Sequence, residues 1–381
     1  GIMSSIARPA GCWPTPAQLL LLRAALEDGE VALSAWRSWQ AVQRIETTDP
    51  GSVFILPQLY LNLRRLCPSE PALVKLRGVY RHTWAKNRLA LEGARAATRA
   101  LSEEGLRPLL LKGISLLACV HNDLGARMMI DTDVAVRHAD FAAADRALTR
   151  LGWQASPAPV SFPLPPFLHA VVYTHPKWLE LDLHVDPLAI PCAESALDGL
   201  WQRAQSLPAS GLAAPAPEPT DLLLLTLVSG RKADPHAQCR WIADAVAILR
   251  KGPIEWDQLA ARAAELQVRP TVLSQLQFLE QSIGVAIPES ALQRLRSAQL
   301  HPSERERDRM LCQIDPAERP LWALLPQRWR QYRSACAMSG QTVSPLQFGR
   351  HCADYLKWKY SLRGVWQVPA LLYRSYRSSH G

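Results

Sequence analysis

Two acidic motifs of the chain carry residue types that can bind a metal cation. The first is Asp131-Thr132-Asp133 and the second is Asp182-Leu183-His184. Side chains two positions apart on a strand project from the same face, so Asp131 and Asp133 can share a divalent cation. Carboxylate oxygens suit Mg²⁺ or Mn²⁺, and a bound cation removes the repulsion between neighbouring acids. The alternative is a strand end whose acids lie in solvent or pair with Arg127.

The second motif lies in an alternating segment, residues 178–186. Its two faces separate completely, with Glu180, Asp182, His184 and Asp186 on one and Leu179, Leu181, Leu183 and Val185 on the other. A solvated face would explain this pattern. If the polar face meets the Asp131 pair, Asp182 completes a two-metal site that activates a hydroxyl and stabilises a leaving pyrophosphate. His184 then contacts a metal, a phosphate or an acceptor. Alternatively, and this we favour, it orients Asp182 or a backbone group from outside the ligand shell.

A basic turn, Lys112-Gly113, precedes both motifs, and Ser115 follows it closely. The turn joins a short apolar run at 109–111, typical of a buried strand, to a segment with helical periodicity at 114–120. Backbone N–H groups at a helix start bind phosphate, and a lysine there adds positive charge. An ordinary strand-to-helix turn is the alternative unless the acids lie nearby. Arg127 is either a phosphate clamp or a partner for the acids.

An α+β core flanked by helices is predicted to position these motifs. A long helix should run from about Ala72 to Glu104 and end near Gly105. Further strands are predicted at 130–136, 168–173 and 178–185, the last two as an antiparallel pair, and a helix at 139–151. Short helices precede this core. After it, helices are predicted at 221–229, 239–249, 256–266 and 270–283.

The order of these elements resembles the polymerase-beta-like nucleotidyltransferase superfamily and, more narrowly, the bacterial "uncharacterised nucleotidyltransferase" family. The resemblance covers roughly residues 72–266 and rests on the order and spacing of the motifs. The matching positions are Lys112-Gly113, Arg127, Asp131-Thr132-Asp133, Asp182-Leu183-His184 and the block Trp241-Ile242-Ala243-Asp244. Asp244 is interpreted as a buried polar link between helices, with a role at the acceptor site left open.

The resemblance implies transfer of a nucleoside monophosphate from an NTP, with ATP as the default donor. Asp131 and Asp133 would hold the metal ions, Asp182 would bridge one metal and act as the base, and Lys112, Gly113 and Ser115 would bind the triphosphate. The sequence departs from the family at Gly113-Ile114, where Ser115 comes one position late. The expected acceptor is a hydroxyl or phosphate of a small molecule or peptide-derived product. The alternatives are an RNA end, or a degenerate nucleotide-binding or interaction module.

We therefore predict a small mixed β-sheet nucleotidyltransferase core with N-terminal helices and a C-terminal helical bundle. The predicted regions are N-terminal helices (1–70), the core with its long leading helix (71–206), a linker or exposed loop (207–219), a helical domain (220–300) and a basic, aromatic-rich helical region (301–381). The net charge of +9 favours polyanionic partners or, alternatively, a merely solvated basic surface. Residues 301–381 carry 13 Lys and Arg against 6 Asp and Glu.

Aromatic and basic residues alternate in that last region, as in the segment 355–360. The mixture suits single-stranded nucleic acid or peripheral contact with an anionic membrane, or else a helix docked by its aromatic residues. No run of apolar residues is long enough for a membrane span, and no signal peptide is evident. Eight cysteines without a C-x-x-C pair favour a reducing, cytoplasmic location.

Overall fold

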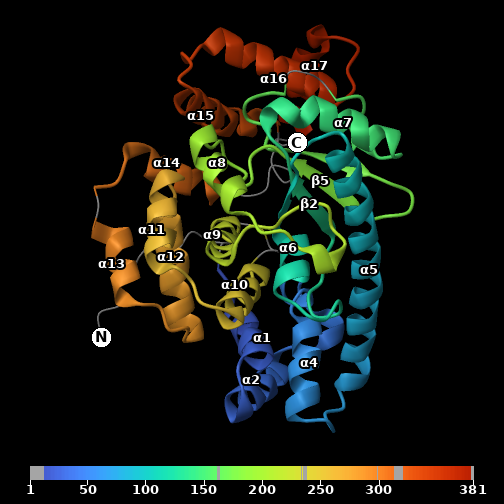
Figure 1. Ribbon diagram of the computed structural model, residues 1–381, viewed down its shortest axis with the longest axis vertical. Helices are drawn as coiled ribbons and strands as arrows, with labels where there is room; N and C mark the ends of the chain where they lie inside the picture. The colour runs from blue at the N-terminus through green and yellow to red at the C-terminus, as the bar shows by residue number, and fades with distance from the viewer. Residues whose placement is uncertain are drawn as a thin grey trace. The chain divides into compact units, whose positions relative to one another are not determined.

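The computed structural model describes residues 13–160, 164–232, 234, 238–297, 299–312 and 321–378. Helices predominate, and one five-stranded mixed sheet is present among the described residues, so the predicted α+β class is confirmed (Figure 1). The chain forms two compact units. The first unit takes its described residues from 1–92, 112–130 and 217–314, and the second from 93–111, 131–216 and 315–381. The five regions predicted from the sequence stay a prediction.

The sheet belongs to the second unit and has the strand order β1-β2-β5-β4-β3. Its strands are β1 (Leu109–Leu111), β2 (Asp131–Ala135), β3 (Gln154–Ser156), β4 (Ala170–Thr174) and β5 (Glu180–His184). Strands β2 and β5 run parallel side by side, and all other pairs are antiparallel (Figure 1). The predicted strands are found within a few residues of their expected ends. Strand β3 was not predicted, because a three-residue edge strand is too short to show a period.

Helix α5 (Leu73–Glu103) is the long helix that the sequence predicts, and Gly105 ends it with a left-handed φ of +75°. Its C-terminal part packs tightly on the β4–β5 hairpin, because a side chain at Gly93 would lie 2.8 Å from Trp178. Helix α7 (Phe141–Arg150) packs on β3 and accepts a hydrogen bond from Tyr173 of β4 through Asp145. Helix α8 (Glu194–Arg203) follows β5.

Residues 207–216, predicted as part of a linker or exposed loop, are held against α5 and β1. The backbone N–H of Leu110 donates to the carbonyl of Pro215, and Arg95 Nε donates to the carbonyl of Ser210. Leu212, Ala214 and Ala216 are buried. The small, weakly polar residues that resemble a linker in sequence therefore serve as close-packed cover for this edge of the sheet.

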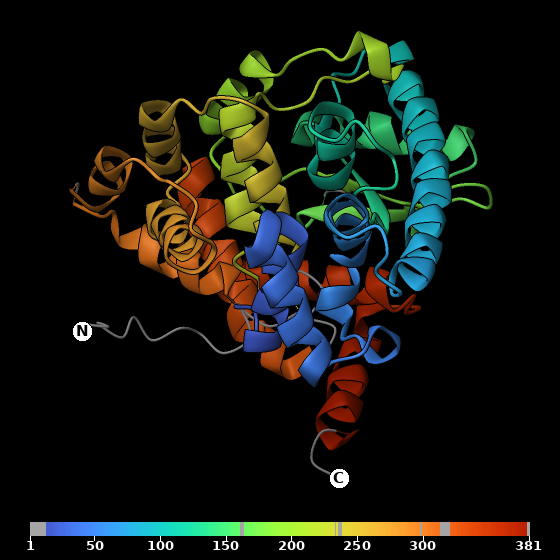
Figure 2. The same cartoon turned by 90° about the horizontal axis from the view of Figure 1, so that it is seen from below.

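The first unit is helical. Its N-terminal helices pack as one group, drawn in blue in Figure 2: α1 (Pro16–Leu26), α2 (Gly29–Val42), α3 (Pro50–Val53) and α4 (Leu56–Leu66). A capping box between Thr15 and Gln18 starts α1. Helix α6 (Lys112–Cys119) contacts α9 within this unit. The later helices are α9 (Pro219–Ser229), α10 (Arg240–Lys251), α11 (Trp256–Glu265), α12 (Arg269–Phe278), the π-helical turn Leu279–Ile283, α13 (Glu289–Ser297) and α14 (Pro302–Leu311).

The C-terminal helices of the second unit are α15 (Leu321–Ser339), α16 (Pro345–Lys359) and α17 (Val368–Ser378). They dock on the segment before β4, where the Phe167 ring meets Phe348 and Tyr355 edge-on, and Trp358 Nε1 donates to the carbonyl of Pro157. Of the region predicted as 301–381, residues 313–320 and 379–381 lie outside the described chain. No helix in the described residues is both long and apolar enough to cross a membrane.

Candidate active site

The parallel pairing of β2 with β5 brings the two acidic motifs together. Asp133 lies directly opposite Asp182 in the register, and Asp131 lies opposite Glu180. Because neighbouring residues in register share a face, the polar side of each strand meets the polar side of the other. The opposite face carries Thr132 and Leu181, both buried. The sheet therefore places acids of β5 beside acids of β2, as the hypothesis required.

Three side chains converge at this point: Asp133, Asp182 and His184. One ligand atom from each lies within 4.8 Å of the other two, which is close enough for a single cation. Asp133 and His184 are 2 % and 1 % exposed, whereas Asp182 is half-buried. The cluster is thus open on the side of Asp182. The two carboxylates and the imidazole form a group that could hold a divalent metal ion, and the choice of Mg²⁺ or Mn²⁺ stays a prediction.

His184 contacts Asp133 directly, with Nε2 at 2.8 Å from Oδ1. A neutral imidazole placed in this way carries its proton on Nε2 and donates it to the carboxylate. While this hydrogen bond is kept, His184 orients Asp133, and the cation is left to carboxylate oxygens. This contact agrees with the favoured hypothesis of orientation from outside the ligand shell, although the expected partner was Asp182 or a backbone group and the partner found is Asp133.

Asp131 begins β2 and lies half-buried on the same face as Asp133. The cluster of neighbouring ligand atoms consists of Asp133, Asp182 and His184. Asp131 lies two residues before Asp133 along the same strand. Its role as a metal ligand therefore stays a prediction.

Asp186, also placed on the polar face by the sequence pattern, lies beyond the end of β5 and serves the following loop. Its Oδ1 accepts from the N–H of Cys192, and its Oδ2 lies 3.9 Å from His138 Nε2. The nearby Asp186 carboxylate raises the pKa of His138 above its ordinary value, against the opposing effect of burial. Asp186 thus stabilises the turn after the site.

The basic turn has an unusual backbone. Leu111 pairs with Asp133 in the β1–β2 register, and Lys112, the next residue, has a left-handed φ of +43°. A left-handed non-glycine residue is strained and persists only where surrounding structure imposes it. Ser115 is fully buried in the first turns of α6, and its Oγ finds no hydrogen-bond partner among the described residues. An orphaned buried hydroxyl beside a helix start fits a phosphate-binding turn.

Arg127 forms a two-point ion pair with Asp244 of α10. Its Nε and Nη2 lie 2.7 and 2.8 Å from the two carboxylate oxygens, and both side chains are buried. The interpretation of Asp244 as a buried polar link agrees with this contact. The partner of Arg127 was not identified from the sequence, because 117 residues separate the two and neither lies in a motif with that spacing. A phosphate-clamp role for Arg127 stays a prediction.

His169 is a neighbour of the cluster that the sequence analysis missed. It directly precedes β4, and its ring lies 5.9 Å from that of His184. The available signal was the predicted hairpin, since Ala170 pairs with His184 in the β4–β5 register. Without the hairpin register, no spacing in the sequence links the two histidines.

A mixed sheet that joins acids from two parallel neighbouring strands is consistent with the class of protein that the resemblance implied, a nucleotidyltransferase. A family model described as "Uncharacterised nucleotidyltransferase" matches residues 54–284. This range contains the acid cluster, the basic turn and Asp244, and it exceeds half of the chain. The protein belongs to this uncharacterised nucleotidyltransferase family. No curated protein sequence matches the chain.

Proposed function

We propose that the protein transfers a nucleoside monophosphate from an NTP, with ATP as the default donor, to a hydroxyl or phosphate of a small-molecule or peptide-derived acceptor. The observation that carries this proposal is the pairing of Asp133 with Asp182 on adjacent parallel strands, with their ligand atoms within 4.8 Å. Such a pair in a nucleotidyltransferase chain supports metal-assisted chemistry at this edge of the sheet.

In the proposed reaction an acceptor oxygen attacks the α-phosphorus, a new P–O bond forms, and the bond to pyrophosphate breaks. Asp131, Asp133 and Asp182 would hold Mg²⁺ or Mn²⁺, which supplies Lewis-acid stabilisation of the charge that develops on the phosphates. Asp182, on the open side of the cluster, would accept the acceptor's proton. His184 would keep Asp133 oriented through its hydrogen bond.

Lys112, Gly113, Ser115 and Arg127 are proposed to bind the triphosphate. The N–H groups at the start of α6, the buried Ser115 Oγ and the lysine charge together suit several phosphate oxygens. We also propose that the protein is located in the cytoplasm, because the spacing of its cysteines matches no disulfide scaffold.

A second candidate acceptor is an RNA end. The observation that favours it is the exposed surface of α16, α17 and the turn between them. Trp366 is 70 % exposed and Tyr373 60 %, and Lys357, Lys359 and Arg363 lie exposed in the same segment. Exposed rings among cations stack on bases and contact phosphates. Contact with an anionic membrane is the other outcome for this surface.

The test uses each of the four NTPs labelled at the α-phosphate, with Mg²⁺ or Mn²⁺, and with or without total RNA or cell extract. Metal-dependent pyrophosphate release with label in a low-molecular-weight or peptide fraction supports the leading proposal. Label in RNA selects the second candidate. A protein that binds NTP without any transfer is a degenerate nucleotide-binding module, and that result would overturn both.

A further inference from the structure

The guanidinium of Arg127 lies between α10 and the first turn of α6, inside the first unit. Two of its nitrogens are taken by Asp244, and this two-point contact fixes the plane of the group. The backbone of Arg127 is held as well, since Asn87 Nδ2 donates to its carbonyl at 2.6 Å and to that of Leu124 at 2.6 Å. Arg127 is therefore fixed at both ends.

The third nitrogen, Nη1, donates to the carbonyl of Met128 at 3.5 Å and also lies beside Gly113 of the basic turn. A methyl group added at Gly113 would lie 2.6 Å from Nη1 and 3.3 Å from Met129 Cγ. A side chain at Gly113 would therefore force the guanidinium, which Asp244 holds, to shift. The structure thus gives Gly113 a second role beside the one read from the sequence, where it was taken to let a ligand approach the backbone.

The guanidinium packs next to a residue with a strained backbone conformation. Lys112 has its left-handed φ of +43° directly before Gly113, and such a conformation needs surrounding structure to impose it. The fixed guanidinium lies against Gly113 on one side of this turn. Stability alone does not call for the ion pair, because well-packed apolar residues in place of a buried pair are often as stable or more so.

We propose that Asp244 is a positioning residue for nucleotide binding. Its carboxylate holds Arg127 so that the guanidinium supports the Lys112–Gly113 turn and places a positive charge beside it. The turn then keeps the shape that receives the triphosphate. This inference rests on the proposed function, specifically on triphosphate binding at that turn.

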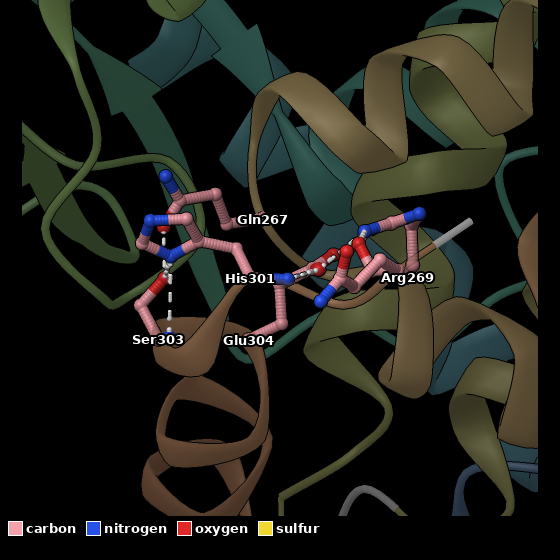
Figure 3. Close-up of polar contacts among 6 residues, drawn as sticks. Gln267, Arg269, His301, Ser303 and Glu304 are labelled. Atoms are coloured by element: carbon pink, nitrogen blue, oxygen red, sulfur yellow. Dashed lines mark hydrogen bonds and ion pairs between the residues drawn. The ribbon is translucent and has the colours of Figure 1, made fainter.

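The chain offers a matched control in the same unit. Arg269 and Glu304 form another two-point buried pair, at 2.8 and 2.6 Å, which Figure 3 shows beside the start of α14. Glu304 also accepts from the N–H of His301, and Ser303 contacts both His301 and Gln267 in the same view (Figure 3). This pair is as buried as the first. It joins α12 to α14 and contacts no residue of the basic turn through the hydrogen bonds described.

The experiment compares Asp244→Asn and Arg127→Lys with Glu304→Gln and Arg269→Lys. Calorimetric binding of each NTP with Mg²⁺, the thermal midpoint, and KM and kcat for pyrophosphate release are measured for every variant. We expect Asp244→Asn and Arg127→Lys to weaken NTP binding by about tenfold or more, with KM raised more than kcat is lowered. The control variants should lose thermal stability while keeping the wild-type NTP affinity.

Three outcomes overturn the inference. Wild-type NTP affinity in both Asp244→Asn and Arg127→Lys would make the pair purely structural, and so would equal weakening in the control variants. If Asp244→Asn fails to fold, Arg127→Lys decides alone, since it keeps the charge. A wild type that binds none of the four NTPs refutes the proposed function itself, and the inference falls with it. Wild-type binding with unchanged variants refutes the inference alone.

Discussion

The two compact units place their buried and half-buried carboxylates in opposite settings. In the first unit Asp244, Glu304 and Asp308 each meet an arginine at two points. In the second unit Asp133 and Asp182 face each other across two strands, with His184 beside them. A guanidinium is charged at every working pH and fixes its carboxylate, so those pairs link separate segments of the first unit. Two facing acids with an imidazole instead favour a cation taken from solution, which is the property of a site.

Removing an acid from the cluster of the second unit should have the largest effect of all the changes considered, and the effect should be on activity. Asp133→Asn and Asp182→Asn should each lower metal-dependent turnover by at least about 10³-fold, because an amide is a poor ligand for Mg²⁺ and adds no negative charge. Pyrophosphate release measures this. Added Mg²⁺ should also raise the thermal midpoint of the wild type but not of the variants.

The matched control for these variants is Asp145→Asn in the same unit. Asp145 accepts a hydrogen bond from Tyr173, and asparagine can still accept it. This variant should keep wild-type turnover. Wild-type turnover in both Asp133→Asn and Asp182→Asn would remove the site from this edge of the sheet.

Removing an acid from an arginine pair should act on stability instead. Glu304→Gln leaves Arg269 buried without its full counter-charge, and the free energy of unfolding should fall by about 3–5 kcal/mol. Denaturant unfolding at neutral pH measures the loss. Hydrogen bonds from Arg269 and the His301 N–H lower the pKa of Glu304, against the effect of burial. The stabilisation is therefore complete above the ordinary carboxyl pKa and is lost as the pH falls through the lower folded value, so wild type and variant should converge in acid.

A Glu304→Gln protein as stable as the wild type would contradict this structural role. So would a wild type whose stability advantage persists unchanged below the folded pKa of Glu304.

Much of the acid site was predictable because it is local in sequence pattern. Alternation places Asp131 with Asp133, and Asp182 with His184, on single faces, and the sequence needs only one long-range step, the pairing of β2 with β5. The resemblance supplied that step. The arginine pairs were not predictable, since Arg127 and Asp244 sit in segments whose local patterns say nothing of each other. The strain at Lys112 was equally hidden, because left-handed backbone is expected at glycine and the glycine here is the next residue.

A histidine of the first unit, His121, can be compared with His184 of the second unit. His121 of the first unit follows α6, and burial lowers its pKa to about 4, although the charge of Asp244 acts in the opposite direction. The folded state thus holds His121 neutral. Its contribution to stability is complete above the unfolded pKa of about 6.5 and is lost as the pH falls toward 4, which amounts to at most about 3 kcal/mol.

The variant His121→Phe removes this titration and keeps an aromatic ring in the same half-buried position. We expect its unfolding free energy to depend less on pH than that of the wild type between pH 6.5 and 4, as measured by urea unfolding at several pH values. Exposed His82 on α5 provides the control, as His82→Phe should leave the wild-type pH profile intact. Identical profiles for wild type and His121→Phe would show that His121 is not buried in its neutral form.

The smallest expected effect concerns His184, whose imidazole forms a hydrogen bond with the carboxylate of Asp133. If His184 orients Asp133 and does not itself bind the metal, His184→Phe should weaken Mn²⁺ binding by only about 10–100-fold, the usual loss for a residue outside the ligand shell. His184→Gln can still donate to Asp133 and should recover part of that affinity. Titration with Mn²⁺ alone, without nucleotide, measures both, and His169→Gln serves as the neighbouring control. Loss as complete as in Asp133→Asn would make His184 a direct ligand, whereas unchanged affinity would mean that the carboxylates of β2 and β5 hold their geometry through the sheet alone.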